Sequence, residues 1–416
     1  MVYGLPFKRP HGESLEAVLV LVFRFGRGRV KRVLVIAAAV LAVLLVSLLL
    51  FAPAIVDRVS NRVLNDPPYA VRAEAERLYR DLFVVDLHGD PLLWDRDLNE
   101  RLSHGSIDVP RLVEGNVGIQ CFFIVSKAPY GQNIDRTEDN SDAITALAVT
   151  QGWPRKTWDS FLERALFQSE RLHGIAARSN GKLVVVKSKS DLRRYRQDRA
   201  ENRQIVAGII GIEGAHALEG DVKNVGKLFD AGVRIMAPTH FFDNDIGGSA
   251  HGVEKGGLTE LGRQMIAEME IRGIVLDLAH ASPALISDAL SIVTRPVVVS
   301  HTGVKGTCDN NRNLTDEQLE GIAATGGVVG IGYWDTAVCG KDATAIASAI
   351  RYTTDLVGVD HVALGSDFDG AVPVPFDTTG LALIAEALLD DGFTEDEIRK
   401  VMGENAVRVF EQTLPD

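Results

Sequence analysis

The chain has 416 residues, of which 46% are hydrophobic and 24% are charged, as is typical of a globular protein with a substantial core. This length has room for two or three average domains, or for one barrel. Residues 1–32 carry a net charge of +5. The remaining residues therefore carry −17, which gives the total of −12 and argues against nucleic acid as a partner of the main domain.

An uncharged apolar run occupies residues 33–54, directly after a cluster of five Arg and Lys residues between 24 and 32. At about 1.5 Å per residue, a helix of this length crosses about 30 Å of hydrocarbon. We therefore expect a basic cytoplasmic segment over 1–32 and a transmembrane anchor or uncleaved signal over 33–55. The positive-inside rule then places the rest of the chain outside the cytoplasm, in the periplasm or the extracellular space. A cleaved signal peptide is the alternative, because "APA" at 52–54 resembles a cleavage site.

A linker and juxtamembrane helix are predicted over 56–80, and eight short apolar runs follow. They are rich in Val and Ile and nearly continuous, as expected of parallel strands that are covered on both faces. Segments of helical character separate them, so the sequence predicts an α/β fold, a (β/α)8 TIM-type barrel over 81–416. A longer interval at about 126–204 predicts an insertion with an extra strand at 182–188. The eight runs are 82–88, 117–125, 205–213, 233–238, 272–280, 295–301, 326–334 and 360–370.

Polar residues stand at the C-terminal ends of these runs, where barrels of this type carry their active sites. They are His88, Asp90, Glu213, His240, His280, His301 and Asp367. Imidazoles and carboxylates are good zinc ligands, so this recurrence predicts a metal centre rather than scattered structural groups. His88 and Asp90 can chelate one ion, His280 and His301 can hold a second, and Glu213 can bridge the two.

The roles of the other polar residues and of the cysteines are less specific. Asp86 and Asp277 are expected to be structural partners of the site, and the loop residues His216 and His251 could contact a substrate. The three cysteines are too few for a disulfide scaffold. In an oxidising compartment, Cys308 and Cys339 can form one disulfide. Alternatively, all three cysteines are small, buried hydrophobic residues.

Taken together, the ordered motifs resemble the membrane (renal) dipeptidase family of binuclear zinc peptidases over roughly residues 75–412. The motifs are "DLHGD", "HGSIDVPRLVEGNVGIQCFF", "GIEGAH", "PTHFFDND", "DLAH", "SHTG", "NNRN" and "GSDFDG". The resemblance implies two zinc ions per chain and hydrolysis of short peptides with a free C-terminal carboxylate, including L,D-dipeptides. It assigns the same five zinc ligands, with Glu213 bridging. It also implies His240 as a substrate or transition-state ligand, Arg312 as the anchor of the substrate carboxylate and Asp367 as the acid/base residue.

Two departures limit what the resemblance implies. Well-known animal members carry a C-terminal lipid anchor, which an N-terminal helix would replace here, and the segment after His240 differs from the animal pattern. Side-chain preference is therefore not carried over, and a homodimer stays open. The alternatives are a binuclear metal hydrolase of another small amide or cyclic metabolite, and a non-catalytic membrane-tethered binding protein.

Overall fold

The computed structural model describes residues 15–416, and its chain divides into two compact units, Met1–Ala52 and Pro53–Asp416. Helix α1 (Leu15–Ser60) includes the run predicted to be an anchor, and the first part of the predicted basic segment, residues 1–14, lies outside the described residues. Within the described part of the chain, no helix combines the length and the apolarity needed to cross a bilayer. The anchor and the domain boundaries therefore stay predictions.

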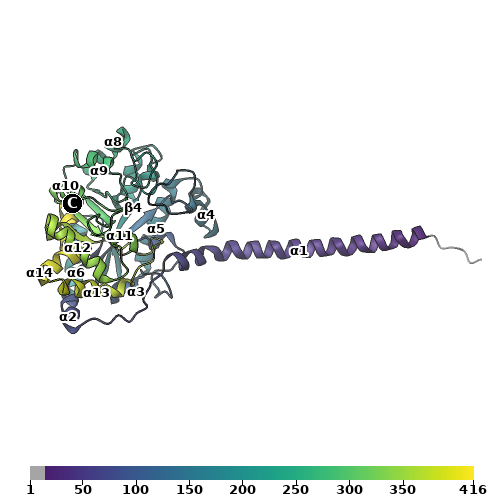
Figure 1. The fold of residues 1–416 in the computed structure, drawn as a ribbon, viewed down its shortest axis with the longest axis horizontal. Helices are drawn as coiled ribbons and strands as arrows, with labels where there is room; N and C mark the ends of the chain where they lie inside the picture. The colour runs from purple at the N-terminus through teal and green to yellow at the C-terminus, as the bar shows by residue number, and fades with distance from the viewer. Residues whose placement is uncertain (1–14) are drawn as a thin grey trace, which may run out of the picture. The chain divides into compact units, whose positions relative to one another are not determined.

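A sheet of nine parallel strands forms the centre of the second unit (Figure 1). Its order is β6-β5-β4-β2-β1-β9-β8-β7, with β3 paired to β4 outside this path. A further parallel bridge pairs Asp277, which follows β6, with Val298 at the start of β7, and so joins the two ends of the path. This arrangement is consistent with the predicted TIM-like barrel. The strands are β1 (Val84–Asp86), β2 (Val117–Val125), β3 (Leu183–Val185), β4 (Val206–Glu213), β5 (Val233–Met236), β6 (Val275–Leu276), β7 (Val298–Thr302), β8 (Val328–Ile331) and β9 (Val362–Leu364).

Helices follow the strands in alternation, as the sequence predicts, and their starts have visible causes. Thr315 and Thr394 each begin a helix with a complete capping box, which satisfies free amides of the first turn. The helices after α1 are α2 (Ala73–Asp81), α3 (Val109–Glu114), α4 (Ala143–Thr150), α5 (Phe161–Arg178), α6 (Lys189–Glu201), α7 (Asn224–Asp230), α8 (Glu260–Arg272), α9 (Pro283–Leu290), α10 (Asp316–Ala324), α11 (Asp335–Val338), α12 (Ala343–Val357), α13 (Ala382–Asp390), α14 (Glu395–Arg399) and α15 (Asn405–Thr413). The predicted insertion holds α4, α5, β3 and α6.

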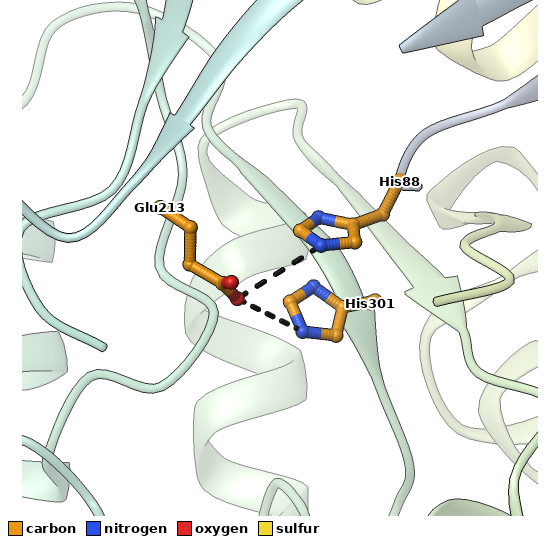
Figure 2. A group of neighbouring side chains, drawn as sticks. All are labelled: His88, Glu213 and His301. Carbon is orange, nitrogen blue, oxygen red and sulfur yellow. Dashed lines mark ion pairs between the residues drawn. The ribbon is translucent and has the colours of Figure 1, made fainter. Parts of the chain in front are cut away.

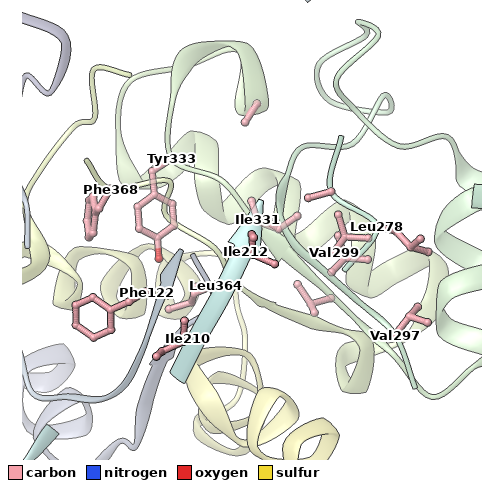
Figure 3. Close-up of a cluster of buried hydrophobic side chains, with 14 of the residues drawn as sticks. Phe122, Ile210, Ile212, Leu278, Val297, Val299, Ile331, Tyr333, Leu364 and Phe368 are labelled. Atoms are coloured by element: carbon pink, nitrogen blue, oxygen red, sulfur yellow. The ribbon is translucent and has the colours of Figure 1, made fainter. Parts of the chain in front are cut away.

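The strands are buried on both faces, which explains their continuous apolar runs. Every residue of β2 and β4 is buried. Successive residues Ile209 and Ile210 of β4 belong to different hydrophobic clusters, because neighbouring side chains of a strand point to opposite faces. Figure 3 shows part of the larger cluster, in which Ile210 and Phe122 lie with residues of β7, β8 and β9.

Two of the three cysteines form the predicted disulfide, and the third is a buried free residue. Cys308 and Cys339 form a disulfide with their Cα atoms 5.3 Å apart, while Cys121 is a buried free thiol in β2. The bridge closes a segment that contains Arg312, one of the predicted site residues.

Candidate metal centre

The predicted polar residues converge at the C-terminal ends of the strands. Seven of the eight predicted site residues line one cavity of about 100 Å³. The eighth, His88, is fully buried directly beside the cavity. The lining residues from the predicted set are Asp90, Glu213, His240, His280, His301, Arg312 and Asp367.

Glu213, the last residue of β4, lies at the centre of four imidazoles. Its Oε1 is 2.8 Å from His280 Nε2, 3.3 Å from His301 Nε2 and 3.9 Å from His88 Nε2. Its Oε2 is 3.2 Å from His240 Nε2. Figure 2 shows how the rings of His88 and His301 point toward the Glu213 carboxylate. One carboxylate from one strand therefore meets histidines that follow or end four other strands.

Three overlapping groups of side chains bring their ligand atoms close enough to hold a metal ion. The groups are His88–Glu213–His301, Glu213–His240–His280 and His88–Asp90–Asp367, each with its atoms within 4.8 Å of one another. This grouping separates His280 from His301, whereas the sequence paired them on one ion. The two Nε2 atoms nevertheless lie 3.0 Å apart, so a shared ion is also compatible with the geometry.

Several buried polar atoms of the cavity lack a hydrogen-bond partner among the described residues. They include His88 Nε2, Asp90 Oδ1 and Glu213 Oε1. An unpartnered buried polar atom is costly, and cations held by the groups that contain these residues would satisfy them. Together with the facing Nε2 atoms of His280 and His301, these atoms show that the residues fit a metal ion.

Burial shifts the ionisation of the whole cluster. It lowers the pKa of His88 to about 4, and it lowers the pKa of His280 and His301 well below the usual value. It also raises the pKa of Glu213 and Asp90 well above that of a free carboxyl group, and nearby carboxylates add to the rise. The imidazoles are therefore neutral, which is the form that binds metals, and a cation would restore the ionised carboxylates.

The outer nitrogens of the rings are held by polar partners. Ser300 Oγ lies 3.0 Å from the Nδ1 atoms of both His88 and His301, and His251 Nε2 lies 2.9 Å from His280 Nδ1. Such contacts fix a ring so that its Nε2 faces the cavity. Sequence reasoning missed Ser300, although its position directly before His301 is a usable signal. His251 had been considered only as a substrate contact.

Asp86 and Asp277 tie the strand ends together, as expected of structural partners. Asp86 accepts hydrogen bonds from Ser366 N (2.9 Å) and Ser366 Oγ (2.6 Å), and Asp277 accepts one from Ser300 N (2.8 Å). His216 is not among the residues that line the cavity, and it lines a neighbouring pocket instead. The structure thus leaves the predicted substrate contact of His216 without support.

Arg312 brings a positive charge to the cavity wall. Its Nη2 donates to His301 O at 2.7 Å, and its guanidinium carbon lies 5.5 Å from the centre of the Trp334 ring. The side chain is buried, and burial lowers its pKa. A planar guanidinium can pair with a carboxylate through two parallel hydrogen bonds. The cavity therefore combines a metal-binding set of residues with an anchor for an anionic group.

Comparison with known proteins gives one family. A family model described as membrane dipeptidase (peptidase family M19) matches residues 72–414, which include all eight predicted site residues. The solved structure of the dipeptidase AC, a metallo peptidase of family M19, is 26% identical, with a TM-score of 0.64 over 80% of this chain and 99% of that chain.

Two further relatives are similar to this chain, one in its solved structure and one in its sequence. A metallo peptidase from Rhodobacter sphaeroides, liganded with a phosphinate mimic of the dipeptide L-Ala-D-Ala, is 24% identical with a TM-score of 0.65, over 80% of this chain and 99% of that chain. At this identity the likeness shows the fold. A protein from Klebsiella pneumoniae, described as uncharacterized and encoded in the pqqA 5′ region, is 31% identical over 255 residues, covering 58% of this chain and 92% of the relative.

Proposed function

The chain belongs to the membrane dipeptidase family, peptidase family M19, and on this premise we propose that it is a dipeptidase whose centre holds two zinc ions and requires a free C-terminal carboxylate on its substrate. The family and the metal-binding residues make it a metal-dependent dipeptidase. The observation that carries the finer proposal is the position of Glu213. Its two oxygens reach the Nε2 atoms of four histidines that belong to separate strands.

We assign the ligands by chemistry and proximity. His88 and Asp90 would hold one ion, His280 and His301 would hold the other, and Glu213 would be shared between them. Nitrogen and carboxylate donors suit zinc in a catalytic site that keeps positions open for substrate. When bound, the pair of ions would supply Lewis-acid activation of a water molecule and of the scissile carbonyl.

Arg312 would select the substrate. It lies on the wall of a cavity of about 100 Å³, and its guanidinium can grip the C-terminal carboxylate of a short peptide in bidentate fashion. The phosphinate mimic of L-Ala-D-Ala bound to the Rhodobacter sphaeroides relative supports L,D-dipeptides as a class to include.

Asp367 and His240 would handle the charge that moves during hydrolysis. Asp367 Oδ1 lies 3.9 Å from His88 Nε2 at the cavity wall, where a carboxylate can accept a proton from water and pass it to the leaving amine. His240 Nδ1 lies 3.2 Å from Lys127 O, which can only accept, so the proton of a neutral ring is on Nδ1. Burial lowers the pKa of His240 well below its usual value, so the resting ring is neutral and its Nε2 carries no proton. His240 would stabilise an oxyanion through Nε2 only after that atom gains a proton during the reaction.

We also propose that the chain is anchored by residues 33–55, with the catalytic domain outside the cytoplasm. The uncharged run and the basic residues before it support this orientation. The Cys308–Cys339 disulfide supports an oxidising compartment.

A substrate panel on the zinc-loaded full chain tests the function. L,L- and L,D-dipeptides should be hydrolysed, and their C-terminal amides should react far more slowly because Arg312 loses its anionic partner. Faster turnover of cyclic amides than of dipeptides would instead favour a hydrolase of another small amide. If metal analysis after purification without chelator finds less than about one zinc per chain, a non-catalytic binding protein would be favoured.

A further inference from the structure

The last turn of α1 and the residues that follow it pack against the loop that carries Asp367. We call residues 57–65 the brace and residues 366–376 the Asp367 loop. Asn61 Oδ1 accepts a hydrogen bond from Ala371 N at 2.8 Å. Val374 pairs with the brace through two backbone hydrogen bonds of 2.9 Å, from its N to Arg62 O and from Leu64 N to its O. One isolated parallel bridge, between Val63 and Val374, therefore joins the brace to the loop.

A buried chain of charges makes a second link between the same two segments. Arg96 Nε donates to Asp57 Oδ2 at 2.8 Å, and Arg96 Nη1 lies 2.9 Å from Asp369 Oδ2. Asn61 Nδ2 donates to the other Asp57 oxygen at 2.8 Å. Asp57 and Asn61 are only 4% and 3% exposed, so water does not weaken these contacts.

The Asp367 loop has a backbone that needs such support. Asp367, Asp369 and Ala371 have φ angles of +59°, +63° and +61°, in the left-handed region that residues with a side chain rarely adopt. Strained residues persist where surrounding contacts fix them. Asp369 is fixed by Arg96 together with Ser106 N (2.8 Å), and Ala371 is fixed by Asn61. Two of the three strained residues are therefore linked to the brace, Ala371 directly and Asp369 through Arg96, and Asp369 also accepts from Ile107 N at 3.1 Å and from Trp94 Nε1 at 2.7 Å.

We propose that Asp57 and Asn61 are positioning residues that hold the Asp367 carboxylate in the catalytic cavity. The inference rests on the role proposed for Asp367. Ala371 also lines that cavity, so a shift of the loop would reach the reacting groups. The matched family region begins at residue 72, which places the brace outside it. This chain would thus build part of its catalytic geometry from its own N-terminal extension.

Asn61→Ala in the zinc-loaded full chain tests the proposal. We expect kcat to fall by about tenfold or more while KM stays within about twofold and metal content is unchanged, because a small displacement of a catalytic group mainly slows the chemical step. Arg58→Ala is the matched control, since Arg58 is exposed on the same helix end and its side chain donates to Ser103 Oγ at 3.4 Å. This control should leave kcat unchanged.

Hydrogen exchange gives a second readout that does not depend on turnover. The amides of Ala371, Val372 and Val374 should exchange faster in Asn61→Ala than in the wild-type chain or in Arg58→Ala. If wild-type protein fails to hydrolyse dipeptides while this difference is present, the proposed function is wrong and the structural support by the brace stands. Unchanged kcat in both Asn61→Ala and Asp57→Asn, or unchanged exchange in Asn61→Ala, would overturn the positioning role.

Discussion

Replacing Glu213 with glutamine is the most direct test of the proposed metal centre. The substitution keeps the size of the side chain and removes its charge. Glu213 belongs to two of the three groups of metal-binding residues, so its loss should weaken both ions rather than one. Without metal, Glu213 is a buried carboxyl group whose pKa is raised by burial, so the same substitution should cost the metal-free protein little.

The expected change in thermal stability follows from the linkage between zinc binding and folding. If each ion loses about 100-fold in affinity, each loses about 2.7 kcal/mol of stabilisation at a fixed saturating zinc concentration, or about 5 kcal/mol for two. The unit Pro53–Asp416 has about 360 residues, and unfolding near 60 °C releases about 2.1 cal/mol/K per residue. One kcal/mol then shifts Tm by about 1.3 °C, so the zinc-dependent rise in Tm should shrink by about 7 °C.

Calorimetry with zinc and with chelator measures this difference, and metal analysis measures the bound zinc. Glu254→Gln is the matched control, because Glu254 is exposed and is not among the residues that line the cavity. A Glu213→Gln protein that keeps two zinc ions and the full zinc-dependent rise in Tm would show that Glu213 is not shared between the ions. Loss of stability in the chelated protein to the same extent would indicate a packing role instead.

Three further substitutions probe separate parts of the site. Asp367→Asn should lower kcat by about a thousandfold while metal analysis finds the zinc content unchanged, and loss of zinc with normal turnover of the remaining holoenzyme would contradict the acid/base role. Arg312→Lys should raise KM for dipeptides by about 10- to 100-fold, since lysine keeps the charge and loses the bidentate fork. Equal KM values for the variant and the wild-type chain would show that Arg312 does not anchor the substrate carboxylate. Cys308→Ser with Cys339→Ser should lower the unfolding free energy by about 3.7 kcal/mol for the 31-residue separation, and denaturant titration that finds no change under oxidising conditions would refute this value.

The sequence predicts which strands exist better than it predicts where each strand begins and ends. Each of the eight apolar runs contains a strand, because continuous Val and Ile in short runs suit positions that are buried on both faces. The run 272–280 nevertheless yields only β6 (Val275–Leu276). The chain then turns so that Asp277 accepts hydrogen bonds from Ser300 N and Ala279 N, and His280 takes a φ of +61°. The contact with Ser300 comes from a separate strand, so a local pattern cannot place the end of β6.

The site was predictable where it depends on strand ends and unpredictable where it depends on side-chain direction. Parallel strands bring their C-terminal ends to one face, so Glu213, His280 and His301 were expected to meet. Which histidine shares a group with which carboxylate depends on rotamers, and the support of the rings by Ser300 and His251 depends on loop paths. The brace was invisible for the same reason, since nothing in the sequence near Asn61 indicates a partner some 310 residues away.

The charge in the cavity sets what a pair of ions would need from the substrate. Asp90, Glu213 and Asp367 bring −3 when ionised, and Arg312 brings +1. Buried charge is expensive unless it is compensated, so a single divalent cation would bring this set to neutrality. Two such cations would leave an excess of +2, which a substrate carboxylate and an attacking hydroxide together would offset when the amino group of the substrate is neutral. A centre that reaches neutrality only with its substrate present would bind anionic peptides better than their amides. Because lysine preserves this balance, any loss in Arg312→Lys reports the geometry of the guanidinium and not its charge.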